Sequence, residues 1–404
     1  MSAVEKIGSA GTAARSPYFT EEHEALRDQV RRFVETEIKP HAKAWEEAGF
    51  VPREVLRKMG SLGFFGIRYP AEYGGSEMDT LATVVLAEEL GRSTFSGVAI
   101  TALVHTDMAS VHIANAGSKA QRDRLMPAII AGEKIVAVAV TEPDAGSDVK
   151  GIRTTARREG DSYVLNGAKV YITNGVHADL YCVAAKTDLS AKPSQSVSIF
   201  LVEKGTPGFR VARELDKHGW RSSDTAELVF EDCRIPAENL LGQEGRGFYA
   251  IMSNFQNERT VIGAMAMGEA QAAIDLTLDY VKTRKAFGAP LWDKQAIRQK
   301  LAMLAAKVEA SSKAIVGRVA ALDAFVGRAQ DVLAGDVEAQ AGLPQRRCQH
   351  AALRCHEEAD EEQGAGHQDD HRTGRETGQD GRGRRPEIAA EPAEQGGQHD
   401  HQRQ

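Results

Sequence analysis

The sequence predicts an α+β protein in which two helical domains flank a β domain. Apolar residues recur at helical spacing up to about residue 132, and again from about residue 241. Short runs rich in Val, Ile and Tyr fill the interval between them, as is typical of strands. A length of 404 residues exceeds one ordinary hydrophobic core, so several domains are expected.

The N-terminal helical domain is predicted for residues 19–132, after a polar lead-in at 1–18 that we expect to be disordered. Thr20 is a suitable N-cap, because its hydroxyl can accept a hydrogen bond from a free backbone N–H of the first turn. Pro40 ends the first helical run. The segment 97–117 is apolar nearly all round, which predicts a buried helix.

The middle domain, residues 133–240, is predicted to be an antiparallel β domain. Its candidate strands are KIVAVAV, YVL, KVYIT, LYCVAAK, VSIFLVE and AELVFE. Asn166-Gly167 lies between the second and third of these. This dipeptide favours a two-residue hairpin turn, because both central positions of a type I′ turn need a positive φ.

The C-terminal helical domain is predicted for residues 241–333, and a low-complexity tail follows at 334–404. From Pro344 onward the chain has no Val, Met, Phe, Tyr, Trp or Lys, so it cannot bury enough apolar surface to offset chain entropy. We expect this tail to be disordered or translated out of frame. A His/Cys metal tract is the alternative, but its spacing does not match a standard zinc module; its members are Cys348, His350, Cys355 and His356.

The composition and charge of the chain limit the kinds of partner and the cellular location that we expect. A formal net charge of −7 argues against nucleic acid or an anionic membrane as a partner, because either would favour a basic face. No run approaches about 20 uninterrupted apolar residues, so no membrane span is expected. The first residues lack the apolar core of a signal peptide, and four cysteines form no dense framework. These features predict a cytoplasmic protein.

Several short motifs could carry chemistry, and each also has a plain structural interpretation. The turn at 141–148 follows a strand and could cradle an anion, although an ordinary Asx/Ser turn has the same composition. Tyr171 and Thr173 could pack and hydrogen-bond a flat heteroaromatic ring, or form cross-strand pairs. Arg284 lies where Gly288 and Pro290 are expected to separate one long helix from the next. Its guanidinium could bind a phosphate, or it could be a solvated charge at the end of a helix. The sequence contains no GxGxxG motif after the first strand and no P-loop.

Glu258 and Arg259 interrupt an otherwise apolar helical stripe, which consists of Phe248, Ile251, Met252, Phe255, Ile262 and Met265. A carboxylate in such a stripe is costly unless it is paired, hydrogen-bonded or protonated. One explanation is a buried ion pair with Arg259 or with an arginine of a neighbouring helix. The other is that the stripe faces a cavity and Glu258 is a base whose proton affinity burial has raised.

Taken together and in order, these motifs closely resemble the acyl-CoA dehydrogenase family between about Phe19 and Phe325. The matching stretches are LRDQVRRFVETEI, YGG, AVTEPDAGSD, NGAKVYITNG, SSDTAELVFEDCRIPAENLLG and RKAFGAPLWDKQAI. The resemblance implies a helical, a β and a four-helix domain, FAD as cofactor and a homotetramer. The late family motifs are missing here, so the four-helix bundle is expected to be incomplete, with weak FAD retention and impaired assembly.

The resemblance also implies roles for single residues around the flavin. Thr141 and Thr173 would hydrogen-bond the flavin ring, and Val138 and Val140 would line it. Tyr171 stands where many members have Trp, so an aromatic packing partner is kept.

Further roles implied by the resemblance concern the substrate and a neighbouring subunit. Ser147 would lie near the FAD pyrophosphate and the acyl-CoA, and Arg259 near the base. Glu258 occupies the base position of the isovaleryl and long-chain types. The residues expected to reach the FAD of a neighbouring subunit are Arg284, Phe287 and Gln295. The resemblance also places a loop of the family at Ser222, Asp224 and Thr225, whose individual roles are less defined.

The implied reaction is α,β-dehydrogenation of an acyl-CoA thioester to the trans-2-enoyl-CoA. Glu258 would take the α proton while the β hydride passes to flavin N5. Electron-transfer flavoprotein is the expected acceptor, and no metal is expected at the site. Two alternatives remain: a non-catalytic product of a C-terminally damaged gene, and an acyl-CoA oxidase.

Overall fold

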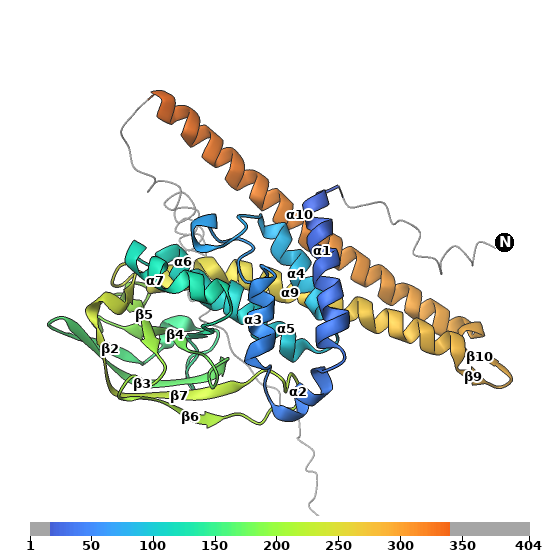
Figure 1. The fold of residues 1–404 in the computed structure, drawn as a ribbon, viewed down its shortest axis with the longest axis horizontal. Coiled ribbons are helices and arrows are strands. Elements are labelled where there is room, and N and C mark those ends of the chain that lie inside the picture. The colour runs from blue at the N-terminus through green and yellow to red at the C-terminus, as the bar shows by residue number, and fades with distance from the viewer. Residues whose placement is uncertain (1–16, 340–404) are drawn as a thin grey trace, which may run out of the picture. The chain divides into compact units, whose positions relative to one another are not determined.

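The structure is a computed structural model that describes the backbone of residues 17–339 and the side chains of residues 17–321. Figure 1 shows helices, then a β domain, then two long helices, which is the predicted fold class. The predicted lead-in at 1–18 and tail at 334–404 lie almost wholly outside the described residues. The domain boundaries around them stay predictions.

The N-terminal region is helical. Thr20 begins the first helix as predicted: its hydroxyl accepts from the backbone N–H of His23, and the His23 ring accepts from the Thr20 N–H in return. The π-helical turns are η1 (Val34–Ile38) and η3 (Val104–Ala109), and η2 (Ala71–Tyr73) is a 3₁₀ turn. The α-helices are α1 (Glu21–Phe33), α2 (Ala42–Ala48), α3 (Arg53–Ser61), α4 (Thr80–Gly91), α5 (Ser96–Leu103), α6 (Ser110–Ala116) and α7 (Lys119–Ile130).

Two helical segments, Ser96–Ala116 and Gly247–Thr283, are long and apolar enough to cross a membrane by length and composition alone. The first is 94% buried inside the protein, which is the burial of a core helix and agrees with its all-round apolar sequence. The second is 33% buried and packs one side against the N-terminal helices.

The middle domain is one eight-stranded sheet with the order β6-β7-β3-β2-β4-β5-β8, and β1 pairs with β4. Most neighbours are antiparallel, but β1 runs parallel to β4. The strands are β1 (Val136–Ala139), β2 (Thr155–Glu159), β3 (Ser162–Thr173), β4 (Leu180–Lys186), β5 (Val197–Glu203), β6 (Phe209–Glu214), β7 (Thr225–Pro236) and β8 (Leu240–Leu241). Short helical turns are η4 (Val149–Gly151), α8 (Pro193–Ser196) and η5 (Ala237–Asn239).

The predicted hairpin at Asn166-Gly167 is wrong. Strand β3 runs straight through both residues, and the β2–β3 turn lies earlier, between Glu159 and Ser162. Gly167 instead marks a shift in the register of β3 against β7, with φ of +149°. A Cβ there would lie 2.5 Å from the Thr154 hydroxyl, so close cross-strand contact rather than a turn requires the glycine.

The C-terminal region consists of α9 (Gly247–Thr283) and α10 (Gln295–Ala339). Between them lie β9 (Lys285–Ala286), β10 (Ala289–Pro290) and the 3₁₀ turn η6 (Leu291–Asp293). The predicted break at Gly288 and Pro290 is therefore correct. Helix α10 continues past residue 333, where the sequence predicted the domain to end.

Close backbone contact between α4 and α9 sets the distance at which α9 packs on the N-terminal helices. A Cβ on Gly268 of α9 would lie 2.0 Å from the carbonyl oxygen of Glu88, and one on Gly91 of α4 would lie 2.1 Å from that of Met265. Only glycine permits this approach. Val261 and Ala264 of α9 complete the apolar core of the N-terminal helices.

Candidate active site

The predicted flavin-lining residues come from the end of β1 and the turn after it. Val138, Val140 and Thr141 are half-buried. Val138 and Val140 pack against the apolar cluster that also receives Met252 and Phe255 of α9. The structure thus brings the end of β1 and the first half of α9 to one apolar region.

A buried ion pair that the sequence did not reveal holds this turn to β3. The Lys169 ammonium lies 2.7 Å from Glu142 Oε1 and 3.0 Å from the carbonyl oxygen of Val140, and its side chain is fully buried. Glu142 also accepts from the backbone N–H groups of Arg153 at 2.5 Å and Thr154 at 3.0 Å. Burial lowers the pKa of Lys169 to about 8 against the attraction of Glu142. Burial opposes ionisation of Glu142, but Lys169 and the hydrogen bonds hold its pKa below the ordinary value.

Tyr171 and Thr173 lie near the C-terminal end of β3, two and four residues after Lys169. Tyr171 is 69% exposed although it is a large aromatic residue, and its φ of +60° is unusual for a side chain of this size. Thr173 is half-buried. Within the described residues, neither the Thr173 hydroxyl nor that of Thr141 has a hydrogen-bond partner.

The turn after Thr141 is open to solvent at its glycine. Ser147 is exposed, and a Cβ on Gly146 would meet no atom within 4 Å. Backbone N–H groups beside such open space suit an anionic group. The ordinary Asx turn is also present in part, because Asp148 accepts from the backbone N–H of Lys150.

The loop residues Ser222, Asp224 and Thr225 are buried and serve the scaffold in this structure. Ser222 donates its hydroxyl to Glu46 Oε1 at 2.5 Å, joining the loop to α2. Asp224 accepts from the backbone N–H of Val176 at 2.6 Å. Thr225 pairs with Thr173 across β7 and β3. The loop thus leads into Thr225, the cross-strand partner of Thr173.

Arg284, Phe287 and Gln295 are not near these residues. They belong to the β9–β10 hairpin and the start of α10, at the end of the two long helices away from the sheet (Figure 1). Phe287 is 96% exposed with a φ of +56°. One chain thus does not bring this predicted group together with Thr141 and Thr173.

Glu258 lies on α9, half-buried, with Asn254 one helical turn before it. The Asn254 Nδ2 group donates to Glu258 Oε1 at 2.8 Å. Burial raises the pKa of Glu258 to about 7, against smaller opposing effects of the Asn254 hydrogen bond and the charge of Arg259. Arg259 is exposed, and its guanidinium carbon lies 5.5 Å from the centre of the Phe255 ring. The stripe therefore accommodates the carboxyl of Glu258 but turns Arg259 outward, so the predicted buried Glu258–Arg259 pair is not found.

Sequence reasoning missed the polar groups that surround Glu258. Asn254 is buried, and its Nδ2 also faces the carbonyl oxygens of Asp107 and Met108 in η3, each at 3.3 Å. The Asp107 side chain is itself buried, and burial raises its pKa to about 6. A carboxylate in the apolar segment 97–117 was the one signal in the sequence that could have indicated this cluster.

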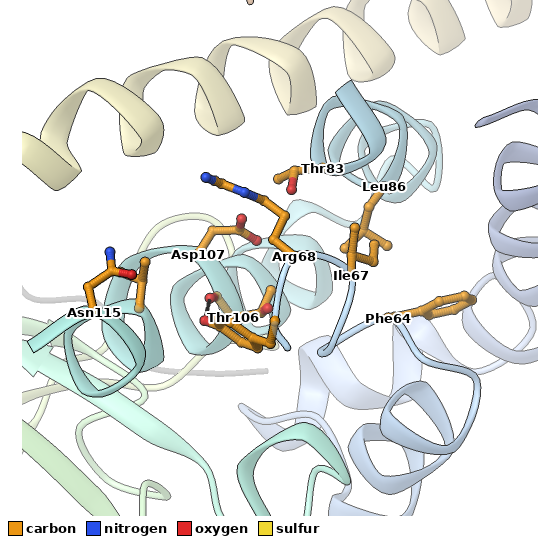
Figure 2. A pocket seen from close by; sticks show the side chains of 10 residues that line it. Phe64, Ile67, Arg68, Thr83, Leu86, Thr106, Asp107 and Asn115 are labelled. Carbon is orange, nitrogen blue, oxygen red and sulfur yellow. Dashed lines mark hydrogen bonds between the residues drawn. The ribbon is translucent and has the colours of Figure 1, made fainter. Parts of the chain in front are cut away.

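A small cavity of about 70 Å³ adjoins this cluster. Figure 2 shows the side chains of Arg68, Thr83 and Asp107 at its wall. Arg68 donates to the side-chain oxygen of Asn257 at 2.7 Å, which ties the cavity to α9. Among residues 17–321, no group of three or more His, Cys, Asp or Glu is arranged to hold a metal ion.

Comparison with known proteins identifies the family. Three models match in order: acyl-CoA dehydrogenase N-terminal domain at residues 20–133, middle domain at 137–233 and C-terminal domain at 245–364. A crystal structure of acyl-CoA dehydrogenase from Geobacillus kaustophilus superposes with a TM-score of 0.72 and 41% identity, covering 76% of this chain and 81% of that one. The chain belongs to the acyl-CoA dehydrogenase family. The predicted resemblance and fold are confirmed.

Individual relatives within the acyl-CoA dehydrogenase family differ in substrate name. The long-chain specific enzyme of Mus musculus mitochondria is 44% identical over 287 residues, 71% of this chain and 66% of that one. The isovaleryl-CoA dehydrogenase of Pongo abelii mitochondria is 40% identical over 286 residues, 70% and 67% of the two chains. The match thus spans slightly under two thirds of the long-chain relative.

One similar structure carries a cofactor in its description. The acyl-CoA dehydrogenase of Bacillus anthracis, described as complexed with FAD, has a TM-score of 0.71 and 34% identity, over 74% of this chain and 51% of that one. The C-terminal family model also extends to residue 364, past the predicted domain end at 333. The out-of-frame origin of the tail stays a prediction, and most of the tail lies outside the described residues.

Proposed function

We propose that this chain catalyses FAD-dependent α,β-dehydrogenation of an acyl-CoA thioester to the trans-2-enoyl-CoA, with Glu258 as the base. The observation that carries the proposal is the environment of Glu258. In a chain of this family, a half-buried carboxyl on α9 has a pKa of about 7. A base that titrates near the working pH combines adequate basicity with a substantial ionised fraction.

The residues present fit FAD. The hydroxyls of Thr141 and Thr173 are free to hydrogen-bond a ring edge, and the exposed Tyr171 offers an aromatic face that is costly to leave in water. Open space at Gly146 beside the exposed Ser147 suits a pyrophosphate. When bound, FAD would supply the acceptor for the β hydride. The Lys169–Glu142 pair would keep the β1 turn and β3 in register around it.

The chain's own part in the reaction is to hold and remove a proton. The ionised carboxylate of Glu258 takes the α proton of the thioester, which is weakly acidic and needs a base of raised proton affinity. Partial burial of Glu258 supplies that affinity. The exposed Arg259 keeps a positive charge near the site, which favours the anionic form of Glu258 between turnovers.

Anaerobic mixing of the FAD-loaded chain with acyl-CoA tests this proposal. The flavin's visible absorbance should be lost in the parent, and Glu258→Gln should slow that loss roughly 10²–10⁴-fold. Asp279→Asn is the matched control, because Asp279 is an exposed carboxylate on the same helix. Undiminished bleaching in Glu258→Gln would refute the assignment.

The same preparation separates the two alternatives. A non-catalytic product of a damaged gene would show no bleaching with any acyl-CoA, even when FAD is retained. An acyl-CoA oxidase would consume oxygen during turnover, whereas the proposed enzyme would need electron-transfer flavoprotein as acceptor. The names of the long-chain and isovaleryl relatives favour a long or branched acyl group, so those thioesters should be tried first.

We also propose that the chain forms homo-oligomers, with the residues of the β9–β10 hairpin reaching the cofactor of a neighbouring subunit. The near-complete exposure of Phe287 and the position of the β9–β10 hairpin away from β3, which carries Thr173, support this view (Figure 1). Large apolar side chains are exposed on α9 and α10 as well: Ile262, Leu276, Tyr280, Met303 and Leu304. Such surfaces favour association. A cytoplasmic location stays a prediction from the sequence.

A further inference from the structure

We propose that Asn254 is a positioning residue that holds Oε1 of Glu258 and leaves Oε2 as the atom that takes the substrate proton. The inference rests on the proposed function only in naming the proton's source. The arrangement itself follows from contacts of the buried Asn254 amide with Glu258 and with the π-helical turn η3.

The orientation of the Asn254 amide is fixed by its surroundings. Its nitrogen lies 3.3 Å from the carbonyl oxygens of both Asp107 and Met108. Carbonyl oxygens can only accept hydrogen bonds, so the NH₂ group, and not the amide oxygen, must face them. The same NH₂ group lies 2.8 Å from Glu258 Oε1 and therefore donates to it. A flipped amide would set oxygen against three acceptors.

The π-helical turn supplies this frame. In η3 the backbone follows i→i+5 spacing, a local widening that is frequent at functional sites. Its Asp107 carbonyl oxygen also accepts from the Asn257 side chain at 3.1 Å, so two asparagines of α9 are held by one turn. Asn254 and Glu258 are four residues apart and lie on one face of α9. The amide thus connects a buried turn to the carboxyl.

As a consequence, the two carboxyl oxygens of Glu258 have different surroundings. A donor on Oε1 stabilises the ionised carboxylate and restricts rotation of the group. Oε2 has no such donor among the described side chains. The charged groups around this pair are Arg259 on α9, Asp107 on η3, and Arg68, which contacts Asn257. Asn254 hydrogen-bonds to none of these three side chains, so Asn254→Leu leaves their own hydrogen bonds in place.

The test measures the titration of Glu258 by ¹³C NMR in FAD-free protein labelled at glutamate side chains, with Glu258→Gln used to assign the signal. Asn254→Leu keeps a similar volume and removes the donor. Asn257→Leu is the matched control: it removes hydrogen bonds with η3 and with Arg68, but Asn257 has no contact with Glu258, and neither Arg68 nor Asp107 contributes to the pKa shift of Glu258. We expect Asn254→Leu to move the midpoint upward by about one pH unit or more, since a hydrogen bond to a charge is lost. Asn257→Leu should leave the midpoint in place.

An unchanged midpoint in Asn254→Leu, or an equal shift in Asn257→Leu, would overturn the inference. Asn254→Ala gives the same reading where the leucine variant does not fold. The proposed function is tested separately: it would be refuted if the Glu258→Gln variant lost its flavin absorbance with acyl-CoA at the parent rate. In an active preparation, Asn254→Leu should also shift the pH profile of flavin reduction to higher pH by the same amount as the NMR midpoint.

Discussion

Replacing Glu258 by Gln should stabilise the FAD-free protein at alkaline pH and have little effect at acid pH. Burial raises the pKa of Glu258 from its ordinary 4.5 to about 7, so the folded state binds a proton more tightly than the unfolded state. The contribution of Glu258 to stability is thus full below pH 4.5 and is lost as pH rises through 7. A shift of that size corresponds to about 3 kcal/mol above pH 7. Because the side chain is partly exposed, solvent screening reduces the expected difference in the free energy of unfolding to about 2 kcal/mol.

Glutamine keeps an oxygen that can accept from Asn254, so the substitution removes the charge and little else. Urea unfolding at about pH 5 and about pH 8, followed by circular dichroism, gives the two free energies that are compared. Asp279→Asn, on an exposed carboxylate of α9, should change neither value appreciably. Equal effects of Glu258→Gln at both pH values, or destabilisation at pH 8, would show that burial does not oppose ionisation of Glu258.

Three further predictions concern buried residues elsewhere in the protein. Lys169→Met should cost about 3–5 kcal/mol, because it leaves Glu142 buried without its partner, and it should weaken FAD binding in fluorescence titration; unchanged binding contradicts the role given to this pair. Burial lowers the pKa values of both His105 and His112 to about 4, so each should contribute about 3 kcal/mol to the parent's loss of stability as pH falls from 6.5 to 4, and His105→Gln should remove its share from the urea-derived profile. Gly268→Ala should cost about 1–3 kcal/mol, since its Cβ would strike the backbone of α4, and an unchanged thermal midpoint would contradict that contact.

Features set by neighbouring residues in the sequence could be predicted. Thr20 caps α1, and the break near Gly288 and Pro290 separates α9 from α10, because caps and helix-breaking residues act over a few positions. Asn166-Gly167 is also a local signal, but the hairpin that it predicts is wrong. Contact with Thr154 across the sheet, rather than the dipeptide's own turn preference, decides its conformation.

Parts of the candidate site that depend on distant residues could not be predicted. The helical stripe indicated Glu258 but gave no partner, since Asn254 is oriented by carbonyl groups of η3 about 147 positions earlier in the chain. Lys169 resembled an ordinary strand residue until Glu142, 27 positions away, was found beside it. Spacing within one helix or strand reports which face a residue occupies, but it carries no information about which other segment covers that face.

The most direct test of Glu258 as the base follows α-proton exchange alone. An acyl-CoA whose β carbon is fully substituted has α hydrogens but no β hydride to lose, so proton removal can be observed without dehydrogenation. In deuterated buffer, the FAD-loaded parent and Asp279→Asn should introduce deuterium at the α carbon, as seen by mass spectrometry, and Glu258→Gln should not. Deuterium incorporation by Glu258→Gln at the parent rate would contradict the central claim, because another group would then remove the α proton.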